Sequence, residues 1–479
     1  MGVLRRTGAD PEAVLSELEA LAIGDVDWSD GRLMSGIYDP GDTAHELAAE
    51  AYRRFLAPNA LYINLYPSAA RMERDILDSV IELLRGDDGV AGSLTTGGTE
   101  SIMLAVKAAR DHARVHRPGI TRPNVVLPVT AHPAFHKAAH YLGLEVIMTP
   151  VDTTGFRADP DAFASALNPD TVLGVGSAPN FSHGTIDPIG SMAAAAAERG
   201  VLFHVDACVG GIYLSVLRRM GGMGREVPDF DFSVPGVTSI STDLHKYGYA
   251  PKNASLVMYR DRELRQHAMF VCSATTEYAV INPTVLSSRS AGPVAAAWAV
   301  MRHLGEEGYE RIVGETHRAT GRVLAAIADI DGIEVLADPE IAMFTLASDE
   351  INVFELDDAM KDRGWTLLPQ FACGGGPANL HVSITWTNLP HMEQFVDDLA
   401  TAVGELRDTG PAVDRSAIEA AVSELEGAPL DHKMLSLAGL AGITGDGVPE
   451  RMAALNTILD LLESGERDQI LATFVNLMN

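Results

Sequence analysis

Short apolar runs alternate with helical patterns between about residue 90 and residue 260. Runs that are apolar throughout, with helices between them, are typical of a mostly parallel sheet that is covered on both faces. The sequence therefore predicts an α/β domain. The runs that read as strands are NVVLPV (124–129), LEVIMTP (144–150), TVLGVGS (171–177), VLFHVDA (201–207), VTSIST (237–242) and ASLVMY (254–259).

Two segments of this region read as helices. PIGSMAAAAAERG ends with Gly200 at the position of a helix C-terminal cap. TESIMLAVKAARDHAR carries Ile102, Ala105, Val106 and Ala109 on one face, as the spacing of an amphipathic helix requires. Both segments fit the crossover helices that parallel strands need.

The pattern changes after about residue 300. A long helix is followed by GIEVLADPEIAMFTLAS, a helix around 353–363 and ANLHVSIT, which predicts a smaller α+β domain. A chain of 479 residues is longer than one hydrophobic core usually supports. We therefore expect an N-terminal helical segment, a large domain, a small α+β domain and a helical C-terminal extension without assigned chemistry, with the bounds 1–60, 61–300, 301–410 and 411–479.

Charge excludes several kinds of partner. Lys and Arg number 36 against 65 Asp and Glu, which gives a formal net charge of -29. Such a charge repels nucleic acid and anionic lipid surfaces, although its simplest meaning is solubility. No segment approaches the roughly 20 consecutive apolar residues that a membrane-spanning helix needs. The N-terminus also lacks the long apolar region of a secretory signal.

The cysteines point to a reducing compartment. Cys208, Cys272 and Cys373 are far apart and form no CxxC pair, so neither a disulfide framework nor a zinc site is expected. We therefore predict a cytoplasmic protein without a bound metal.

The segment SLTTGGTES (93–101) places two glycines and a threonine just before a helical pattern. Free backbone N–H groups and the positive dipole end of a helix form a phosphate cradle, to which Thr99 can add its hydroxyl. Glycine-rich turns before helices are usually only turns, so this motif alone is a weak signal.

Three polar residues lie where strands are predicted to end. Asp206 lies at the end of an apolar run, at the edge where α/β folds bind ligands, and its carboxylate could pair with a protonated pyridine nitrogen. A helix N-cap or a structural ion pair is the alternative. Lys246 follows the next run beside His245, where partial desolvation is expected to lower its pKa for Schiff-base chemistry. His132, after the first run, offers a ring that can stack on a cofactor.

A lone lysine in a loop is usually a solvated charge, and a single histidine at a strand end is usually structural. The order of the motifs changes this interpretation. A phosphate loop, a strand-end carboxylate and then a strand-end lysine predict a site for pyridoxal 5′-phosphate (PLP).

The segments GGTES, HPAFHKAAHYLG, HVDACVGG and STDLHKYGYAPK together resemble the group II PLP-dependent decarboxylase family of fold type I, and within it the sphingosine-1-phosphate lyases. The resemblance extends over roughly residues 25 to 400. It implies a mostly parallel seven-stranded sheet in the large domain, and a homodimer with shared active sites.

Carried over to this chain, the family pattern makes Lys246 the lysine that binds PLP and Asp206 the partner of the pyridine nitrogen. His132 is then the residue stacked on the ring. The pattern assigns the cofactor phosphate to Gly98, Thr99 and His245, with Ser288 reaching the site of the neighbouring subunit.

The resemblance also implies substrate contacts. Tyr38 and Lys252 match residues that bind the substrate phosphate, and Asn59 matches an asparagine near the cofactor. One position departs from the pattern, because Tyr62 stands in NALYINLYP where the lyases carry a histidine. A phenol donates a hydrogen bond but brings no positive charge, so the substrate headgroup could differ.

The resemblance implies a retro-aldol cleavage of phosphorylated sphingoid long-chain bases into a fatty aldehyde and phosphoethanolamine. Two other enzymatic readings remain open. They are α-decarboxylation of an L-amino acid and retro-aldol cleavage of another 2-amino-3-hydroxy compound. A binding protein that has lost turnover is a further alternative, against which the presence of Lys246, Asp206 and His132 argues.

Overall fold

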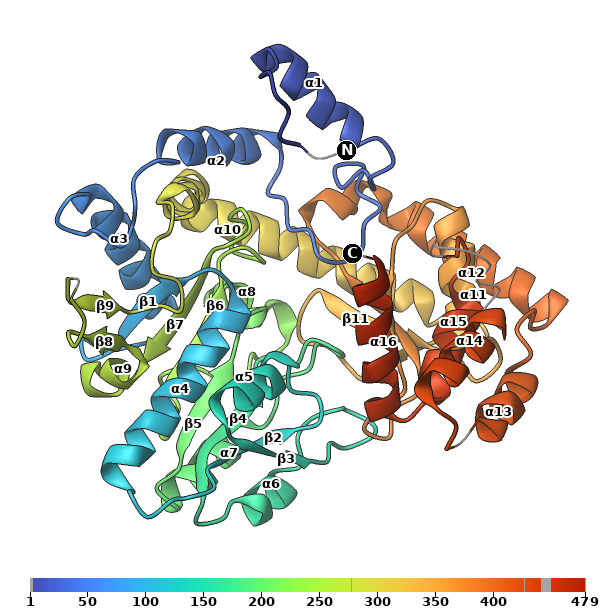
Figure 1. The fold of residues 1–479 in the computed structure, drawn as a ribbon. Helices are drawn as coiled ribbons and strands as arrows, with labels where there is room; N and C mark the ends of the chain where they lie inside the picture. The colour runs from blue at the N-terminus through green and yellow to red at the C-terminus, as the bar shows by residue number, and fades with distance from the viewer. Residues whose placement is uncertain (1–2, 277, 426, 441–448, 479) are drawn as a thin grey trace.

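The computed structural model describes residues 3–276, 278–425, 427–440 and 449–478. A seven-stranded sheet in the order β1-β7-β6-β5-β4-β2-β3 forms its centre (Figure 1). Only β7 runs against its neighbours, so the predicted α/β class with a mostly parallel sheet is confirmed. The strands are β1 (Ala91–Thr95), β2 (Asn124–Pro128), β3 (Glu145–Thr149), β4 (Thr171–Ser177), β5 (Leu202–Asp206), β6 (Ser239–Asp243) and β7 (Ser255–Tyr259).

The six predicted strands lie within two residues of their expected bounds. β1 has no strand pattern in the sequence, because AGSLT is short and contains glycine and serine, which are poor strand formers. Pairing with β7 along all five residues stabilises it in the sheet.

Helices cover both faces of this sheet. On one face α4 packs through Ile102 and Val106 against Phe135 of α5. On the other face Met192 of α7 packs against Phe203 of β5. Gly200 follows α7 with φ +64°, a left-handed conformation that confirms its role at the helix C-terminus. The helices are α4 (Gly98–His116), α5 (Ala134–Leu142) and α9 (Arg262–Ala268) on the first face, and α6 (Pro160–Ala166), α7 (Ile189–Glu198) and α8 (Gly210–Arg219) on the second.

The N-terminal helices are α1 (Pro11–Leu21), α2 (Asp42–Arg54) and α3 (Pro67–Leu83). The long helix α10 (Gly292–Ile327) packs on α2, α3 and α8 and runs on toward the smaller domain (Figure 1). It is interrupted at Gly305, which adopts φ +57°. A short 3-10 turn, η1 (Gly221–Gly224), follows α8, and a small hairpin of β8 (Phe270–Cys272) and β9 (Val280–Asn282) lies beyond α9.

The smaller domain holds a four-stranded antiparallel sheet in the order β10-β11-β13-β12. Its core includes Phe344, Leu380 and Phe395, which are fully buried. The predicted α+β arrangement is therefore confirmed. Its elements are β10 (Glu334–Leu336), β11 (Met343–Ala347), α11 (Val353–Asp362), β12 (Leu368–Gln370), β13 (Asn379–Ser383), η2 (Trp386–His391) and α12 (Met392–Thr409).

The end of the chain is helical and packs on the smaller domain. Asp358 of α11 accepts hydrogen bonds from the backbone N–H groups of Met452 and Ala453, at the start of α15. The guanidinium of Arg467 lies 4.5 Å from the ring centre of Phe371. The helices are α13 (Arg415–Glu424), α14 (Leu430–Leu440), α15 (Ala453–Leu461) and α16 (Ser464–Met478).

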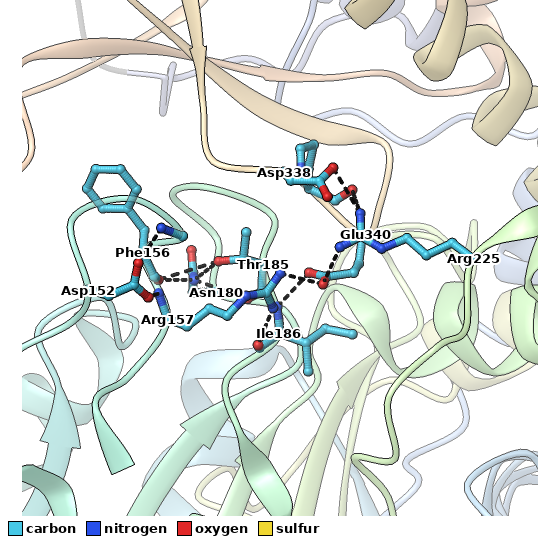
Figure 2. A network of polar contacts seen from close by, with 11 residues as sticks. Asp152, Phe156, Arg157, Asn180, Thr185, Ile186, Arg225, Asp338 and Glu340 are labelled. Carbon is cyan, nitrogen blue, oxygen red and sulfur yellow. Dashed lines mark hydrogen bonds and ion pairs between the residues drawn. The ribbon is translucent and has the colours of Figure 1, made fainter. Parts of the chain in front are cut away.

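A polar network joins the two domains beside the sheet (Figure 2). Glu340, which precedes β11 and is 5% exposed, accepts hydrogen bonds from Arg157 at 2.5 Å, Arg225 at 2.9 Å and the backbone N–H of Ile186 at 2.9 Å. Arg157 also donates to the carbonyl of Ile186. The network therefore holds the segment after β4 between the large and the small domain.

Within the described residues, no helix combines the length and the apolar character that a bilayer crossing requires. The same part of the chain holds no cluster of three side chains suited to a metal ion. Cys208, Cys272 and Cys373 are all free thiols.

Candidate active site

A cavity of about 400 Å³ opens at the carboxyl ends of the central strands. Its wall comes from the start of α4 and from the segments that follow β2, β4, β5 and β6. This is the edge at which parallel α/β sheets bind ligands. Seven of the eleven predicted site residues line it, namely Gly98, Thr99, His132, Asp206, His245, Lys246 and Lys252.

The start of α4 forms one end of the cavity. Gly97 is the N-cap, and no side chain caps the helix, so the first N–H groups have no partner within the helix. A Cβ at Gly98 would lie 2.9 Å from Cys208 Sγ and 3.0 Å from the Asp243 carboxylate, so only glycine fits there without displacement. The backbone of Gly98, the free N–H groups and the positive end of the helix dipole lie together at the start of α4, as a phosphate-binding site requires.

Asp206 ends β5 and is 7% exposed. Its Oδ1 accepts hydrogen bonds from the N–H of Cys208 at 3.1 Å and from the hydroxyl of Ser241 at 3.4 Å. The next helix, α8, has Val209 as its N-cap, so Asp206 is not a helix cap. Among the described residues no basic side chain forms an ion pair with it. The carboxylate therefore lies in the cavity wall with an oxygen left for a ligand.

Lys246 lies in the turn that follows β6, with its Nζ 3.0 Å from Oδ2 of Asp243. Burial by itself would lower the pKa of Lys246, but the Asp243 carboxylate, with smaller effects from Cys208, Tyr38 and Asp206, raises it above the ordinary value. The expectation of a lowered pKa is therefore wrong for this geometry. The reason is a buried carboxylate three residues away, to which the sequence analysis assigns no role.

His132 and His245 are both uncharged near neutral pH. Burial lowers the pKa of each ring, and neighbouring carboxylates only partly offset this effect. His132 Nδ1 accepts a hydrogen bond from the N–H of Ala134 at 3.1 Å, which fixes the ring at the start of α5. His245 Nδ1 lies 2.7 Å from the carbonyl oxygen of Ala254. Two oriented neutral rings therefore line the cavity.

Tyr38 and Lys252 lie together beside this cavity. The ring of Tyr38 packs edge-on against the ring of Tyr247, with centroids 4.9 Å apart. The Nζ of Lys252 lies 5.6 Å from the centre of the Tyr38 ring. Lys252 also donates a hydrogen bond to the carbonyl of Gly36 at 2.6 Å. Burial and the nearby charge of Lys246 lower the pKa of Lys252. The structure thus brings the predicted phenol and ammonium together.

The other three predicted residues do not line the cavity of a single chain. Asn59 Nδ2 donates to Ser288 Oγ at 3.2 Å, and Asn59 Oδ1 accepts from the N–H groups of Leu61 and Arg289. Tyr62 follows in the same loop and is 39% exposed. Asn59 and Ser288 thus form a polar pair between two surface loops, separate from the residues that line the cavity.

Three further residues that line the cavity carry no role in the sequence analysis. Asp243 pairs with Lys246, and Phe181 forms part of the wall and stacks on His381 with centroids 4.3 Å apart. Glu100 Oε1 accepts from the N–H groups of Val285 and Leu286, while Oε2 accepts from Thr96. Asp243 was detectable, since it lies in the lysine motif at the end of a predicted strand. Phe181 and Glu100 acquire their positions only through tertiary contacts.

These residues fit PLP. Oδ1 of Asp243 is buried and has no hydrogen-bond partner within the described structure. It can therefore accept a hydrogen bond from a polar group of a ligand bound beside Lys246. The cradle at Gly98 accommodates a phosphate, and Asp206 and His132 supply a carboxylate and an aromatic ring. The polar groups of the cavity therefore match a phosphorylated, protonated aromatic cofactor.

Comparison with known proteins agrees with this geometry. A family model described as the pyridoxal-dependent decarboxylase conserved domain matches residues 7–346. A second model, for an HTH-type C-terminal domain of pyridoxal-dependent enzymes, matches residues 416–477. A sphingosine-1-phosphate lyase of Drosophila melanogaster is 37% identical over 425 residues, which is 87% of this chain and 76% of the relative.

Two solved structures define the fold further. The sphingosine-1-phosphate lyase of Burkholderia pseudomallei superimposes with a TM-score of 0.80 and 36% identity, over 90% of this chain and 98% of that chain. A glutamate decarboxylase of Lactobacillus brevis superimposes with a TM-score of 0.74 at 19% identity, over 85% of this chain and 95% of that one. The second likeness shows a shared fold alone.

Proposed function

This chain belongs to the pyridoxal-dependent decarboxylase family, and we propose that it cleaves phosphorylated sphingoid long-chain bases into a fatty aldehyde and phosphoethanolamine. The chain is a PLP enzyme. Support for the lyase reaction comes from the 36–37% identity to lyases of Oryza sativa subsp. japonica and Drosophila melanogaster, and from the similar bacterial lyase structure.

In this proposal Lys246 binds the cofactor, Asp206 pairs with its ring nitrogen and His132 stacks on its ring. Gly98, Thr99 and His245 hold its phosphate. Bound PLP supplies an electron sink that stabilises negative charge on the carbon attached to the substrate amine.

The protein side chains then handle protons and the headgroup. The bond between the carbon that bears the amine and the carbon that bears the hydroxyl breaks, and Lys246, acting as the base, takes up the hydroxyl proton as the aldehyde forms. Lys246, whose Nζ lies in the cavity wall, returns a proton to the carbon that bears the amine. Lys252 and Tyr38 bind the substrate phosphate by charge and by a phenolic hydrogen bond.

The observation that carries the lyase proposal is the position of Lys252. It lines the cavity beside Tyr38, and no carboxylate lies within ion-pair distance of it in the described part of the chain. A lysine left without a counter-charge at a cavity wall is suited to an anionic substrate group. The substrate of an amino-acid decarboxylase carries no phosphate group of its own that Lys252 could bind.

Two other reactions are the alternatives to this proposal. Decarboxylation of an L-amino acid would use the same cofactor, and the family name fits it. Cleavage of another 2-amino-3-hydroxy compound is favoured by Tyr62, which brings no charge to the headgroup and is 39% exposed in its loop. Lys252 argues against the first alternative for amino acids without an acidic side chain, and it is compatible with the second.

The test uses the PLP-loaded protein and a phosphorylated long-chain sphingoid base, with fatty aldehyde and phosphoethanolamine measured by mass spectrometry. Lys252→Met removes the charge but keeps much of the side-chain volume. We expect at least about a hundredfold lower kcat/KM for this variant, as for loss of a charged contact. Lys137→Met, on the exposed side of α5, is the matched control and should keep full activity.

Two results would contradict the lyase proposal. One is a protein with a normal bound-cofactor spectrum that forms no aldehyde, which would move the assignment to an amino-acid decarboxylase or to a different hydroxy amine. The other is an active Lys252→Met variant, which would place the substrate phosphate elsewhere.

We further propose that the enzyme is a cytoplasmic homodimer in which Ser288 and Asn59 contribute to the partner's site. Three free cysteines suit a reducing compartment. Exposed apolar side chains gather on the loops that carry Asn59 and Ser288 and on the adjacent hairpin, as an interface between subunits requires. They are Leu56, Ile63, Leu65, Phe270, Val271, Ile281, Val285 and Leu286. Light scattering after size-exclusion chromatography tests the dimer, and an Ile63→Glu variant should shift it to the monomer.

A further inference from the structure

Four polar side chains lie buried on one face of the central sheet. In the parallel pairing of β5 with β6, His204 is opposite Ser239 and Asp206 is opposite Ser241. Alternate residues of a strand point to the same face, so all four side chains face α4 and α5. Buried positions in parallel strands are normally filled by apolar β-branched residues. This polar group is therefore a departure that needs a reason.

Hydrogen bonds join the four side chains in one line. His204 Nδ1 lies 2.9 Å from Ser239 Oγ, and His204 Nε2 lies 3.1 Å from Ser241 Oγ. Ser241 Oγ in turn lies 3.4 Å from Oδ1 of Asp206. The imidazole and Ser241 are fully buried, and Ser239 is 2% exposed. The line runs from the interior of the sheet to the carboxylate in the cavity wall.

The carboxylate fixes the direction of every proton in this line. An ionised Asp206 can only accept, so the Ser241 hydroxyl donates to it. Ser241 Oγ then accepts from His204 Nε2–H, and also from the thiol of Cys208 at 3.3 Å. His204 Nδ1 consequently accepts from the Ser239 hydroxyl. Each donor meets an acceptor, and a chain of bonds aligned in this way strengthens its members.

The histidine is suited to this neutral role. Burial lowers the pKa of His204 to about 4, so it carries no charge near neutral pH. Its ring is held edge-on against Phe135, with centroids 5.8 Å apart. Because the ring is neutral and fixed, it keeps the tautomer in which Nε2 carries the proton, and this N–H donates to Ser241.

We propose that His204 and Ser241 are positioning residues that hold Asp206 as an oriented, ionised partner for the ring nitrogen of PLP. Ser241 Oγ and Cys208 N–H both donate to Oδ1 of Asp206, so together they fix the plane of the carboxylate and leave its other oxygen for the ring nitrogen. An ionised Asp206 keeps the cofactor ring protonated, and so keeps it an effective electron sink. This inference rests on the proposed pairing of Asp206 with that nitrogen and is independent of which bond the enzyme cleaves.

The test compares two cofactors. The full-length protein is freed of cofactor and titrated with PLP, and separately with 1-deaza-PLP, in which a carbon replaces the ring nitrogen. We expect Ser241→Ala to weaken PLP binding about tenfold, the effect of losing one hydrogen bond to a charged group, and to change 1-deaza-PLP binding less than about twofold. His204→Leu, which leaves Ser241 in place but undirected, should weaken PLP binding about threefold.

Two variants serve as controls. Ser215 of α8 is equally buried, and its hydroxyl has no partner within the described structure, so Ser215→Ala should change neither affinity. His204→Gln keeps an N–H donor for Ser241 and should restore most of the affinity that His204→Leu loses.

Equal weakening of both cofactors by Ser241→Ala would show a merely structural role and would overturn the inference. So would an unchanged affinity for PLP. Asp206→Ala separates this failure from that of the proposed function. If Asp206→Ala also weakens the binding of PLP and of 1-deaza-PLP equally, the proposed pairing of Asp206 with the ring nitrogen is wrong. If Asp206→Ala weakens PLP binding more than 1-deaza-PLP binding but Ser241→Ala does not, only the roles of His204 and Ser241 are rejected.

Discussion

Lys246 Nζ and Asp243 Oδ2 lie 3.0 Å apart, and the two residues are separated by a single turn of chain after β6. The carboxylate is 3% exposed, so its charge acts on the ammonium with little screening. The pair keeps the lysine protonated, while nucleophilic attack on an aldehyde requires the neutral amine. If Lys246 binds PLP, as proposed above, Asp243 therefore controls how readily the lysine captures the cofactor.

Asp243→Asn is expected to make capture of PLP possible at lower pH. With the carboxylate gone, burial still disfavours the charged amine, so the pKa of Lys246 falls. The pH at which capture proceeds at half its maximal rate should shift down by about one unit or more. Stopped-flow absorbance of the bound cofactor measures this rate. Asp88→Asn, which removes an exposed carboxylate, should leave the profile in place, and an unshifted profile for Asp243→Asn would contradict the assigned role.

Gly98→Ala is expected to damage the phosphate cradle. The new methyl would lie 2.9 Å from Cys208 Sγ and 3.0 Å from the Asp243 carboxylate, which costs about 1–3 kcal/mol of overpacking or displaces the helix start. We expect PLP affinity to fall at least about tenfold, as measured by fluorescence titration. Gly119→Ala meets no atom within 4 Å and is the matched control. Normal affinity in Gly98→Ala would place the phosphate elsewhere.

The free energy of unfolding should respond to Asp357 in a defined pH range. Burial and the neighbouring charge of Asp358 raise the pKa of Asp357 to about 7, above its ordinary value of 3.8. A carboxyl with a raised folded-state pKa favours the fold while protonated, so its contribution is full below pH 4 and is lost as the pH rises toward 7. Asp357→Asn should therefore stabilise the protein at pH 8 by about 2 kcal/mol after allowance for solvent screening, and hardly at pH 4. Urea unfolding at the two pH values measures this difference, and equal stabilisation at both would refute it.

Glu340 is expected to be the most sensitive residue of the contact between the domains. Its removal leaves Arg157 and Arg225 without their shared acceptor and the N–H of Ile186 unpaired. Glu340→Ala should lower the free energy of unfolding by about 3 kcal/mol, whereas Glu340→Gln, which keeps an acceptor, should lower it less. Thermal unfolding followed by circular dichroism measures both. A loss below about 1 kcal/mol for the alanine variant would show that the contact is only peripheral.

The apolar runs predict six of the seven central strands, because a strand buried on both faces has a continuous apolar signature. β1 has no such signature, and its strand conformation depends on pairing with β7. The same distinction holds for the site. Asp206 lies at the end of a predicted strand, and His132 and Lys246 lie in the turns after two others, so the topology alone brings them to one edge of the sheet.

Other features depend on contacts that no local pattern encodes. The role of Glu100 depends on a loop 185 residues away, and Phe181 lies in the cavity wall stacked on His381, which is 200 residues further along the chain. The pKa of Lys246 was predicted in the wrong direction, since the sign depends on a distance of 3.0 Å and not on burial alone. Tertiary distances, not residue types, decide these cases.

The antiparallel strand β7 has a consequence for how the protein tolerates changes in length. Lys246 lies in a loop whose two ends are paired to each other, because Asp243 lies opposite Ser255 in the ladder. A residue inserted or deleted between them would either displace Lys246 within the loop or slip β7 against both neighbours, which would turn the side chains of β7 to the wrong face. Library designs that vary loop length should leave 244–254 unchanged, and place insertions in exposed connections such as the one around Gly119.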